Sequence, residues 1–325
     1  MRYLEVGGVR VSRIGLGTWQ FGSKEWGYGR GYVDHVAPVI VRRALELGVT
    51  VFDTAELYGW GLSERILGAA VGDRRDDAFL ATKILPVLPT APVVRWRARR
   101  SAARLGVEAI DLYQVHWPNP LVPIRSTMAG MRRLQDDGMI RHVGVSNFSV
   151  RRWERASEAL GRPVLSNQVQ FSLAVPGAAD SVIPFAAAND RMVMAYSPLA
   201  WGLLSGKYHE RSVVPDDIRR HGSMFTRQNL RRAAPLLDLL REVARTNDAT
   251  PAQVALAWII RRPNTVAIPG ASRVDQMESN AAAADLDLTD EQDRALTEAS
   301  VAFAPRRGLS ALPEVAVTKL RRYGR

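Results

Sequence analysis

Three ionisable side chains stand at the ends of short apolar runs. Asp53 ends VTVFD, Lys83 ends AFLATK and His116 ends IDLYQVH. Tyr58 follows Asp53 by five residues, just before a helix expected to begin near Ser63. If the runs are strands of one parallel barrel, their carboxyl ends meet at the same mouth. Each residue alone is explained as the end of a strand leaving the core, but together they indicate one reaction site.

These four side chains suit the delivery of a proton to a carbonyl oxygen. A free phenol has a pKa of about 10, which makes it a weak acid at neutral pH. A cation at Lys83 would stabilise the phenolate of Tyr58 and lower its pKa, while Asp53 would keep the ammonium charged and fixed. His116 would donate a hydrogen bond to the same carbonyl oxygen as hydride arrives.

The elements that would position this group alternate between apolar runs and helices. Runs rich in β-branched residues recur along the chain, and most precede a stretch of helical periodicity. Such alternation implies parallel pairing, and a closed (β/α)8 TIM barrel leaves no sheet edge. The expected strands are 13–17, 50–53, 78–83, 110–116, 140–145, 164–170, 192–196 and 265–268, with helices at about 36–48, 62–72, 91–105, 124–137, 150–160, 179–189, 233–262 in two pieces and 273–284.

Three segments extend the barrel. Residues 3–11 alternate across a Gly-Gly turn, which predicts an N-terminal hairpin that plugs one end. Residues 200–232 form a long loop after strand seven, rich in Gly, Pro and charge. Residues 285–325 begin the C-terminal extra helices, with Thr289 as an N-cap beside Glu291, and continue as a basic tail. Residues 1–325 are interpreted as a single domain.

The composition is that of a folded globular protein. Of the 325 residues, 46% are hydrophobic and 24% charged, which excludes a disordered or fibrous chain. The absence of cysteine excludes disulfide scaffolds, thiolate metal sites, cysteine nucleophiles and iron–sulfur clusters. Redox chemistry would therefore need a borrowed cofactor.

The chain is strongly basic, with a formal net charge of +11. Its basic clusters are short, separated and not interleaved with aromatic residues, which does not favour nucleic-acid binding. A positive field suits a polyanionic small ligand. Residues 1–17 lack the apolar core of a signal peptide, and no run reaches the ~18 apolar residues of a membrane helix. We expect a cytoplasmic protein with no nucleic-acid or membrane partner.

The sequence resembles the aldo-keto reductase superfamily over nearly its whole length, through segments whose order and spacing are specific in combination. The resemblance implies a catalytic tetrad of Asp53, Tyr58, Lys83 and His116, the same four residues. The matching segments are GLGTWQFG at 15–22, FDTAELYGWGLSERILG at 52–68, ATK at 81–83, IDLYQVHWP at 110–118, IRHVGVSNFS at 140–149, NQVQFS at 167–172, YSPLAWGLLSGKY at 196–208 and IPGASRVDQMESN at 268–280.

The resemblance also implies a nicotinamide cofactor, NADPH (NADP+) in preference to NADH, extended across the barrel mouth without a Rossmann fold. The sequence holds no GxGxxG motif, and the nearest approach, at residues 15–20, lacks the last glycine. Ser146, Asn147 and Gln168 resemble the family's partners of the carboxamide. Tyr196 resembles the ring on which the nicotinamide stacks, and a buried strand aromatic is its alternative reading.

Two further segments resemble the family's phosphate contacts. Residues 197–207 resemble the pyrophosphate loop, and Ser272 with Arg273 are candidates for the 2′-phosphate. Many relatives carry an acid just before Asn280, where this chain has Ser279, and this departure bears on the NADP preference. The complete set expected to bind the cofactor is Gly17, Thr18, Trp19, Asp53, Ser146, Asn147, Gln168, Tyr196, Ser197, Pro198, Leu199, Gly202, Leu204, Ser205, Gly206, Lys207, Ile268, Gly270, Ser272, Arg273, Gln276 and Asn280.

Aromatic residues are expected near the mouth of the barrel. Trp19, Trp26, Tyr28 and Trp117 indicate an aromatic-lined pocket for a carbonyl substrate, with Trp201 as a further candidate. Ordinary packing is the alternative reading of each.

The leading hypothesis is an NADPH-dependent oxidoreductase that reduces aldehydes or ketones to alcohols, with Tyr58 as general acid. An alternative is a nucleotide-sensing accessory subunit, because similar barrels with YSPL and IPGA segments serve as partners of membrane channels. A metal-dependent isomerase or hydrolase would need clustered ligands, and we expect no metal site because the histidines are scattered. These are His35, His116, His142, His209 and His221.

Overall fold

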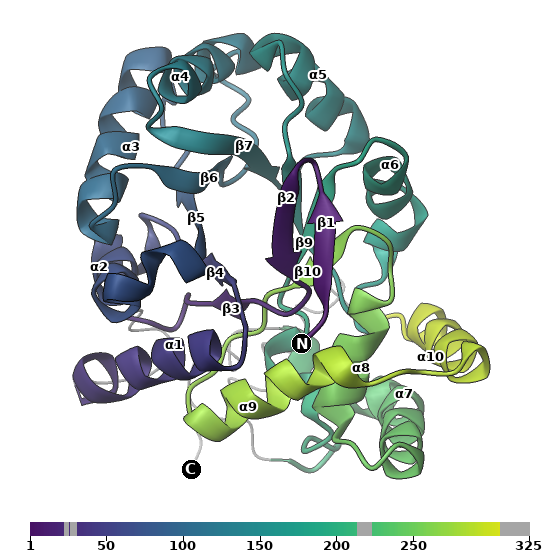
Figure 1. Ribbon diagram of the computed structural model, residues 1–325. Helices are drawn as coiled ribbons and strands as arrows, with labels where there is room; N and C mark the ends of the chain where they lie inside the picture. Colours follow the sequence, from purple (N-terminus) through teal and green to yellow (C-terminus); the bar gives the residue numbers. More distant parts are fainter. Residues whose placement is uncertain (23–25, 27–30, 213–222, 306–325) are drawn as a thin grey trace, which may run out of the picture.

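The structure is a computed structural model that describes residues 1–22, 26, 31–212 and 223–305 (Figure 1). Within these ranges, one sheet holds eight strands, and each strand pairs in parallel with the next strand of the chain. The strands are β3 (Leu16–Gly17), β4 (Val51–Asp53), β5 (Phe79–Ile84), β6 (Ile110–Val115), β7 (Ile140–Ser146), β8 (Ser166–Gln170), β9 (Met192–Tyr196) and β10 (Thr265–Ala267).

The first and last strands of this sheet meet and close it. Ile14 forms a parallel bridge with Ala267, and Gly17 forms a second one with Gly270. A Cβ atom on Gly17 would lie 2.9 Å from the carbonyl oxygen of Ile268, so this close approach requires glycine. The expected (β/α)8 TIM barrel is thereby confirmed.

Helices surround the barrel (Figure 1). Their apolar side chains are buried in the core cluster that they share with the strands. In α5, for example, Trp153, Ala156 and Leu160 recur at helical spacing and are buried. No helix in the described ranges is long and apolar enough to cross a membrane. The α-helices are α1 (Ala37–Glu46), α2 (Leu62–Val71), α3 (Ala91–Leu105), α4 (Ile124–Asp136), α5 (Val150–Leu160), α6 (Val182–Ala188), α7 (Arg227–Thr246), α8 (Pro251–Ile260), α9 (Val274–Ala282) and α10 (Asp290–Ala302).

The amino-terminal hairpin plugs one end of the barrel, as expected. Strands β1 (Tyr3–Val6) and β2 (Val9–Ser12) pair antiparallel and appear in purple in Figure 1. Leu4, Val6 and Val11 are buried in one cluster with side chains from the barrel interior. The hairpin therefore covers the end opposite the carboxyl ends of the strands.

The start of one helix, α7, differs from the expectation, and the start of another, α10, agrees with it. Helix α7 begins at Arg227, six residues before the expected position 233, because Thr226 caps it by accepting a hydrogen bond from the backbone N–H of Asn229. The start of α10 agrees with the expected N-cap at Thr289. Its capping box uses Gln292 rather than the neighbouring acid.

Candidate active site

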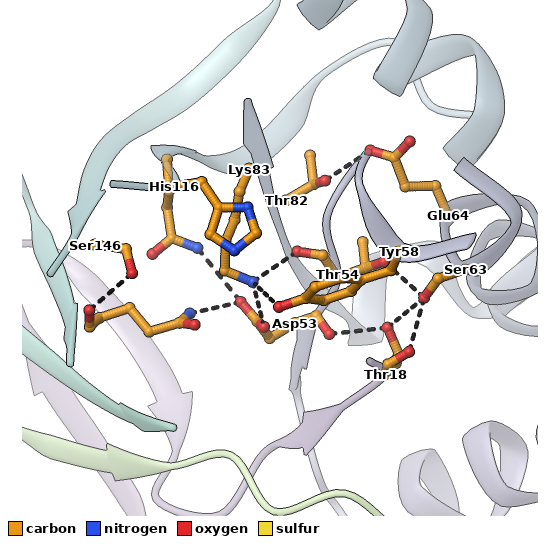
Figure 2. A network of polar contacts seen from close by, with 12 residues as sticks. Thr18, Asp53, Thr54, Tyr58, Ser63, Glu64, Thr82, Lys83, His116 and Ser146 are labelled. Carbon is orange, nitrogen blue, oxygen red and sulfur yellow. Dashed lines mark hydrogen bonds and ion pairs between the residues drawn. The ribbon is translucent and has the colours of Figure 1, made fainter. Parts of the chain in front are cut away.

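The carboxyl ends of β4, β5 and β6 bring the four predicted side chains together (Figure 2). The ammonium of Lys83 donates to Asp53 Oδ2 at 2.6 Å, to the carbonyl of Thr54 at 2.8 Å and to the hydroxyl of Tyr58 at 3.3 Å. The ring of His116 lies 5.8 Å from that of Tyr58, nearly perpendicular to it. Phenol, ammonium, carboxylate and imidazole thus form one contiguous group.

Asp53 is held on both of its oxygens. Oδ2 accepts from Lys83, while Oδ1 accepts from Gln168 at 2.7 Å and from Gln114 at 3.4 Å. Burial opposes the charge of Lys83, but Asp53 and Tyr58 outweigh it, and the pKa of Lys83 is raised. Sequence reasoning missed Gln114, whose signal was a polar residue within the buried strand β6.

The phenol of Tyr58 is a weaker acid than the sequence analysis expects. Burial raises the pKa of Tyr58, and Lys83 opposes this rise without reversing it. The expected lowering of the Tyr58 pKa is therefore wrong for this structure. Burial destabilises the phenolate more than the neighbouring ammonium of Lys83 stabilises it. At neutral pH Tyr58 keeps its proton, which is the form that can donate.

His116 is neutral at physiological pH. Burial, followed by the nearby charge of Lys83, lowers the pKa of His116 to about 3. Its Nδ1 atom is buried and has no hydrogen-bond partner among the described residues. A neutral imidazole can donate one hydrogen bond to a ligand oxygen without adding charge to the site.

The hydroxyls of Thr18, Thr54 and Ser63 form a hydrogen-bonded group next to the backbone of Asp53 (Figure 2). Thr18 Oγ1 donates to the backbone carbonyl of Asp53 at 2.9 Å, and it lies 2.7 Å from Ser63 Oγ. The hydroxyl of Thr54 donates to the same Ser63 Oγ at 2.8 Å. Thr18 is buried and does not line the cavity, so it supports Asp53 from behind instead of contacting a ligand.

A cavity of about 800 Å³ opens over this group. Its size is in the range of small-molecule sites. Asp53, Tyr58 and His116 line it, while Lys83 lies behind and reaches it only through its partners. The cavity can therefore admit a ligand to the phenol and imidazole, and leaves the cation protected from solvent.

Comparison with known proteins gives the family. The Aldo/keto reductase family profile matches residues 13–301. The chain belongs to the aldo/keto reductase family. It is 56% identical over 306 residues to an uncharacterized oxidoreductase of Mycobacterium tuberculosis, covering 94% of each chain.

Solved structures agree with this assignment. A glycerol dehydrogenase from Gluconobacter oxydans superposes with a TM-score of 0.85 at 28% identity, covering 94% of this chain and 97% of the other. An aldo/keto reductase from Klebsiella pneumoniae in complex with NADP and acetate gives a TM-score of 0.72 at 28% identity, covering 95% and 98%. The chain is thus an oxidoreductase by family, and its barrel is that of aldo/keto reductases.

One side of the reductase cavity carries the amides expected near a carboxamide. Ser146, Asn147, Gln168 and Tyr196 all line it. The hydroxyl of Tyr196 donates to Asn147 Oδ1 at 3.0 Å, and Asn147 Nδ2 donates to Ser146 Oγ at 3.1 Å. The Nε2 of Gln168 donates to Asp53 Oδ1 at 2.7 Å, so the side-chain amide of Gln168 is already tied to the buried ion pair.

Part of the expected pyrophosphate loop faces the cavity. Leu204 is buried, and neither Leu204 nor Gly206 lines the cavity. The carbonyl of Gly206 instead accepts from Arg241 at 2.8 Å. The residues of this segment that line the cavity are Ser197, Pro198, Leu199, Trp201, Gly202, Ser205 and Lys207.

The segment before α9 supplies the other arm of the cavity. Arg273 pairs with Asp275 through two contacts, at 3.0 and 2.9 Å. Glu278 pairs with Arg43 of α1 at 2.7 Å and does not line the cavity, whereas Ser279 does. The expected residues that line this arm are Ile268, Gly270, Ser272, Arg273, Gln276 and Asn280.

Aromatic rings surround the entrance near Tyr58. Trp19 lies 6.3 Å from Tyr58 and 5.3 Å from Trp26, measured between ring centroids. Trp117 and Trp201 also line the cavity, while Tyr28 lies outside the described residues. Gly17 lines it as well. Lining residues that sequence reasoning did not single out are Gln20, Leu57, Gln170, Thr250, Ala252, Pro269, Ala271 and Asp275.

Proposed function

We propose that this protein reduces an aldehyde or ketone to an alcohol reversibly with NADPH. The observation that carries the proposal is the Lys83 ammonium between Asp53 and Tyr58, directly behind the cavity. The cavity is lined by the amides of Asn147 and Gln168 and by the basic side chains of Lys207 and Arg273. The NADP complex of the Klebsiella pneumoniae relative supports the choice of cofactor. The relatives' names are those of oxidoreductases, which does not favour an accessory subunit.

The cavity fits a phosphorylated nicotinamide cofactor. Asn147 and the carbonyl oxygen of Gln168 would hold the carboxamide, and Tyr196 would support the ring. Lys207 and Arg273 supply positive charge on the arms where phosphates would lie. Arg273 would exchange Asp275 for a phosphate, which an exposed pair permits at small cost.

The residues then divide the chemistry. A bound nicotinamide supplies the hydride that adds to the carbonyl carbon. His116 donates a hydrogen bond that orients the carbonyl oxygen and stabilises its growing negative charge. Tyr58 gives its hydroxyl proton to that oxygen, which completes the alcohol, and Lys83 stabilises the phenolate left behind. Asp53 balances Lys83 throughout, and solvent returns the proton to Tyr58.

Replacing the proton donor tests the proposal. Tyr58→Phe should lower kcat for carbonyl reduction by about 100- to 10,000-fold, because general acid catalysis contributes that much. Quenching of tryptophan fluorescence by NADPH should persist, because Trp19 and Trp201 remain at the cavity. A screen of aldehydes, quinones and sugar-derived ketones supplies the substrate. Wild-type turnover in the variant would refute the assignment.

A further inference from the structure

Two carboxylates, one buried at Glu64 and one mostly shielded at Glu56, bracket the end of β5 that carries Lys83. Thr82, the residue before Lys83, donates its hydroxyl to Glu64 Oε1 at 2.7 Å (Figure 2). Leu85, two residues after Lys83, donates its backbone N–H to Glu56 Oε1 at 2.5 Å. The strand is therefore fixed on both sides of the ammonium.

Glu56 belongs to the same short loop as Tyr58. Its backbone N–H donates to the carbonyl of Lys83 at 3.3 Å, and the N–H of Tyr58 closes a turn onto the carbonyl of Ala55 at 3.0 Å. Glu56 thus joins the loop of Tyr58 to the strand of Lys83 through both its main chain and its side chain. This loop carries the Tyr58 hydroxyl and this strand carries Lys83 Nζ, and these two atoms lie 3.3 Å apart.

Two arginines of α3 hold these carboxylates in place. Arg97 donates to Glu56 Oε1 at 2.7 Å and to the carbonyl of Leu85 at 3.2 Å. Arg104 donates to Glu64 at 2.5 Å and lies 4.0 Å from Glu56, which links the two pairs. The side chains of Glu56 and Glu64 are 12% and 0% exposed, so either carboxylate would be costly without its arginine.

We propose that Glu56, held by Arg97, is a positioning residue that sets the separation of Tyr58 from Lys83. The inference rests on the function proposed above. Buried ion pairs give little net stability compared with apolar residues of the same volume. What points to positioning is the place of this pair, which joins the loop of Tyr58 to the strand of Lys83. A displacement of about 1 Å in a catalytic group can cost about 100-fold in rate.

The chain contains a matched control for this bracket. Asp111 is a buried carboxylate that accepts from the backbone N–H of Leu80, also in β5, at 2.8 Å. It pairs with Arg75 at 2.7 Å and with Arg141 at 3.1 Å. The chemistry matches that of Glu56, but Leu80 lies three residues before Lys83, about 10 Å along the strand.

The test compares Glu56→Leu, Glu56→Gln and Asp111→Leu in the full chain. The first readout is the NMR resonance of Tyr58 in the free protein labelled with ring-13C tyrosine and assigned by Tyr58→Phe. Glu56→Leu should move this resonance, while Asp111→Leu should leave it in place. Glu56→Gln should restore it, because the amide oxygen can still accept from Leu85 and Arg97.

The second readout is steady-state reduction, corrected for the folded fraction. Glu56→Leu should lower kcat by about 10- to 100-fold with little change in KM for NADPH or the carbonyl substrate, because ligand contacts are untouched. Asp111→Leu should keep the kcat of the wild type even if it melts earlier. Glu56→Gln should lie within about threefold of the wild type.

Two outcomes would overturn the proposal. One is an unmoved Tyr58 resonance with wild-type kcat in Glu56→Leu, and the other is an equal loss in Glu56→Leu and Asp111→Leu. If Glu56→Leu does not fold, Arg97→Met supplies the same readouts from the other side of the pair. The resonance needs no cofactor or substrate, so it decides the positioning role even if the proposed reduction fails.

Discussion

Two ion pairs at the candidate site have similar geometry and opposite surroundings. Lys83 and Asp53 lie 2.6 Å apart with side chains 0% and 4% exposed. Arg273 and Asp275 lie 2.9 Å apart with side chains 64% and 65% exposed. Distance is therefore not what distinguishes them, and solvent access is.

The difference separates a fixed charge from an exchangeable one. Because Lys83 and Asp53 are almost entirely shielded from solvent, parting them would leave two buried charges unpaired, which is costly. In water, the exchange of Asp275 for an anionic ligand would cost Arg273 little. The proposed function accordingly assigns catalysis to the buried pair and phosphate recognition to the exposed pair.

Breaking the buried pair should have the largest effect. Lys83→Met leaves the Asp53 carboxylate buried and unbalanced, which should cost about 3–5 kcal/mol of unfolding free energy and about 100- to 10,000-fold in kcat. Chemical denaturation and steady-state kinetics measure the two losses. The double variant Lys83→Met with Asp53→Asn should recover stability but not rate. Recovery of both would show that the ammonium serves only the fold.

The buried imidazole should make stability depend on pH. His116 has a pKa of about 3 when folded and an ordinary value of 6.5. Between these values the unfolded chain binds more protons, so its contribution to stability is lost as the pH falls from 6.5 towards 3, by about 1.4 kcal/mol per pH unit. Urea unfolding of wild type and His116→Asn across this window measures the difference. If the unfolding free energies of the two proteins changed with pH in parallel, the lowered pKa of His116 would be contradicted.

Breaking the exposed pair should have the smallest effect on the fold and a selective effect on binding. Arg273→Ala should raise KM for NADPH about tenfold while KM for NADH changes little, because a charged phosphate contact contributes about 1.5 kcal/mol. The thermal midpoint should not change measurably. Asp275→Asn is the matched control, and should leave NADPH binding intact or tighter. Equal losses for both cofactors would remove Arg273 from the phosphate site.

The sequence predicts the tetrad because each member stands at a recognisable place. Asp53 ends β4, Lys83 is the last residue but one of β5, and His116 follows β6 directly, so the barrel brings these three positions close together. Barrel closure follows from the same repetition of strands and helices. Residues whose positions follow from strand order alone were therefore open to prediction.

Burial and long-range partners were not open to prediction in the same way. The raised pKa of Tyr58 depends on how much water the assembled loops exclude, which no spacing reveals. Arg97 and Glu56 are 41 residues apart in the sequence, and no local pattern in either segment indicates that the two side chains pair. Thr18 occurs within a matching segment, yet its side chain turns away from the cavity to the backbone of Asp53.

The most direct test of the account is the pH profile of single-turnover reduction in wild type and Tyr58→Phe. In the proposed mechanism reduction needs the protonated phenol, so the wild-type rate should hold through neutral pH and fall only above the raised pKa of Tyr58. The residual rate of Tyr58→Phe should lack this alkaline limb. An unchanged alkaline limb in Tyr58→Phe would show that another group delivers the proton.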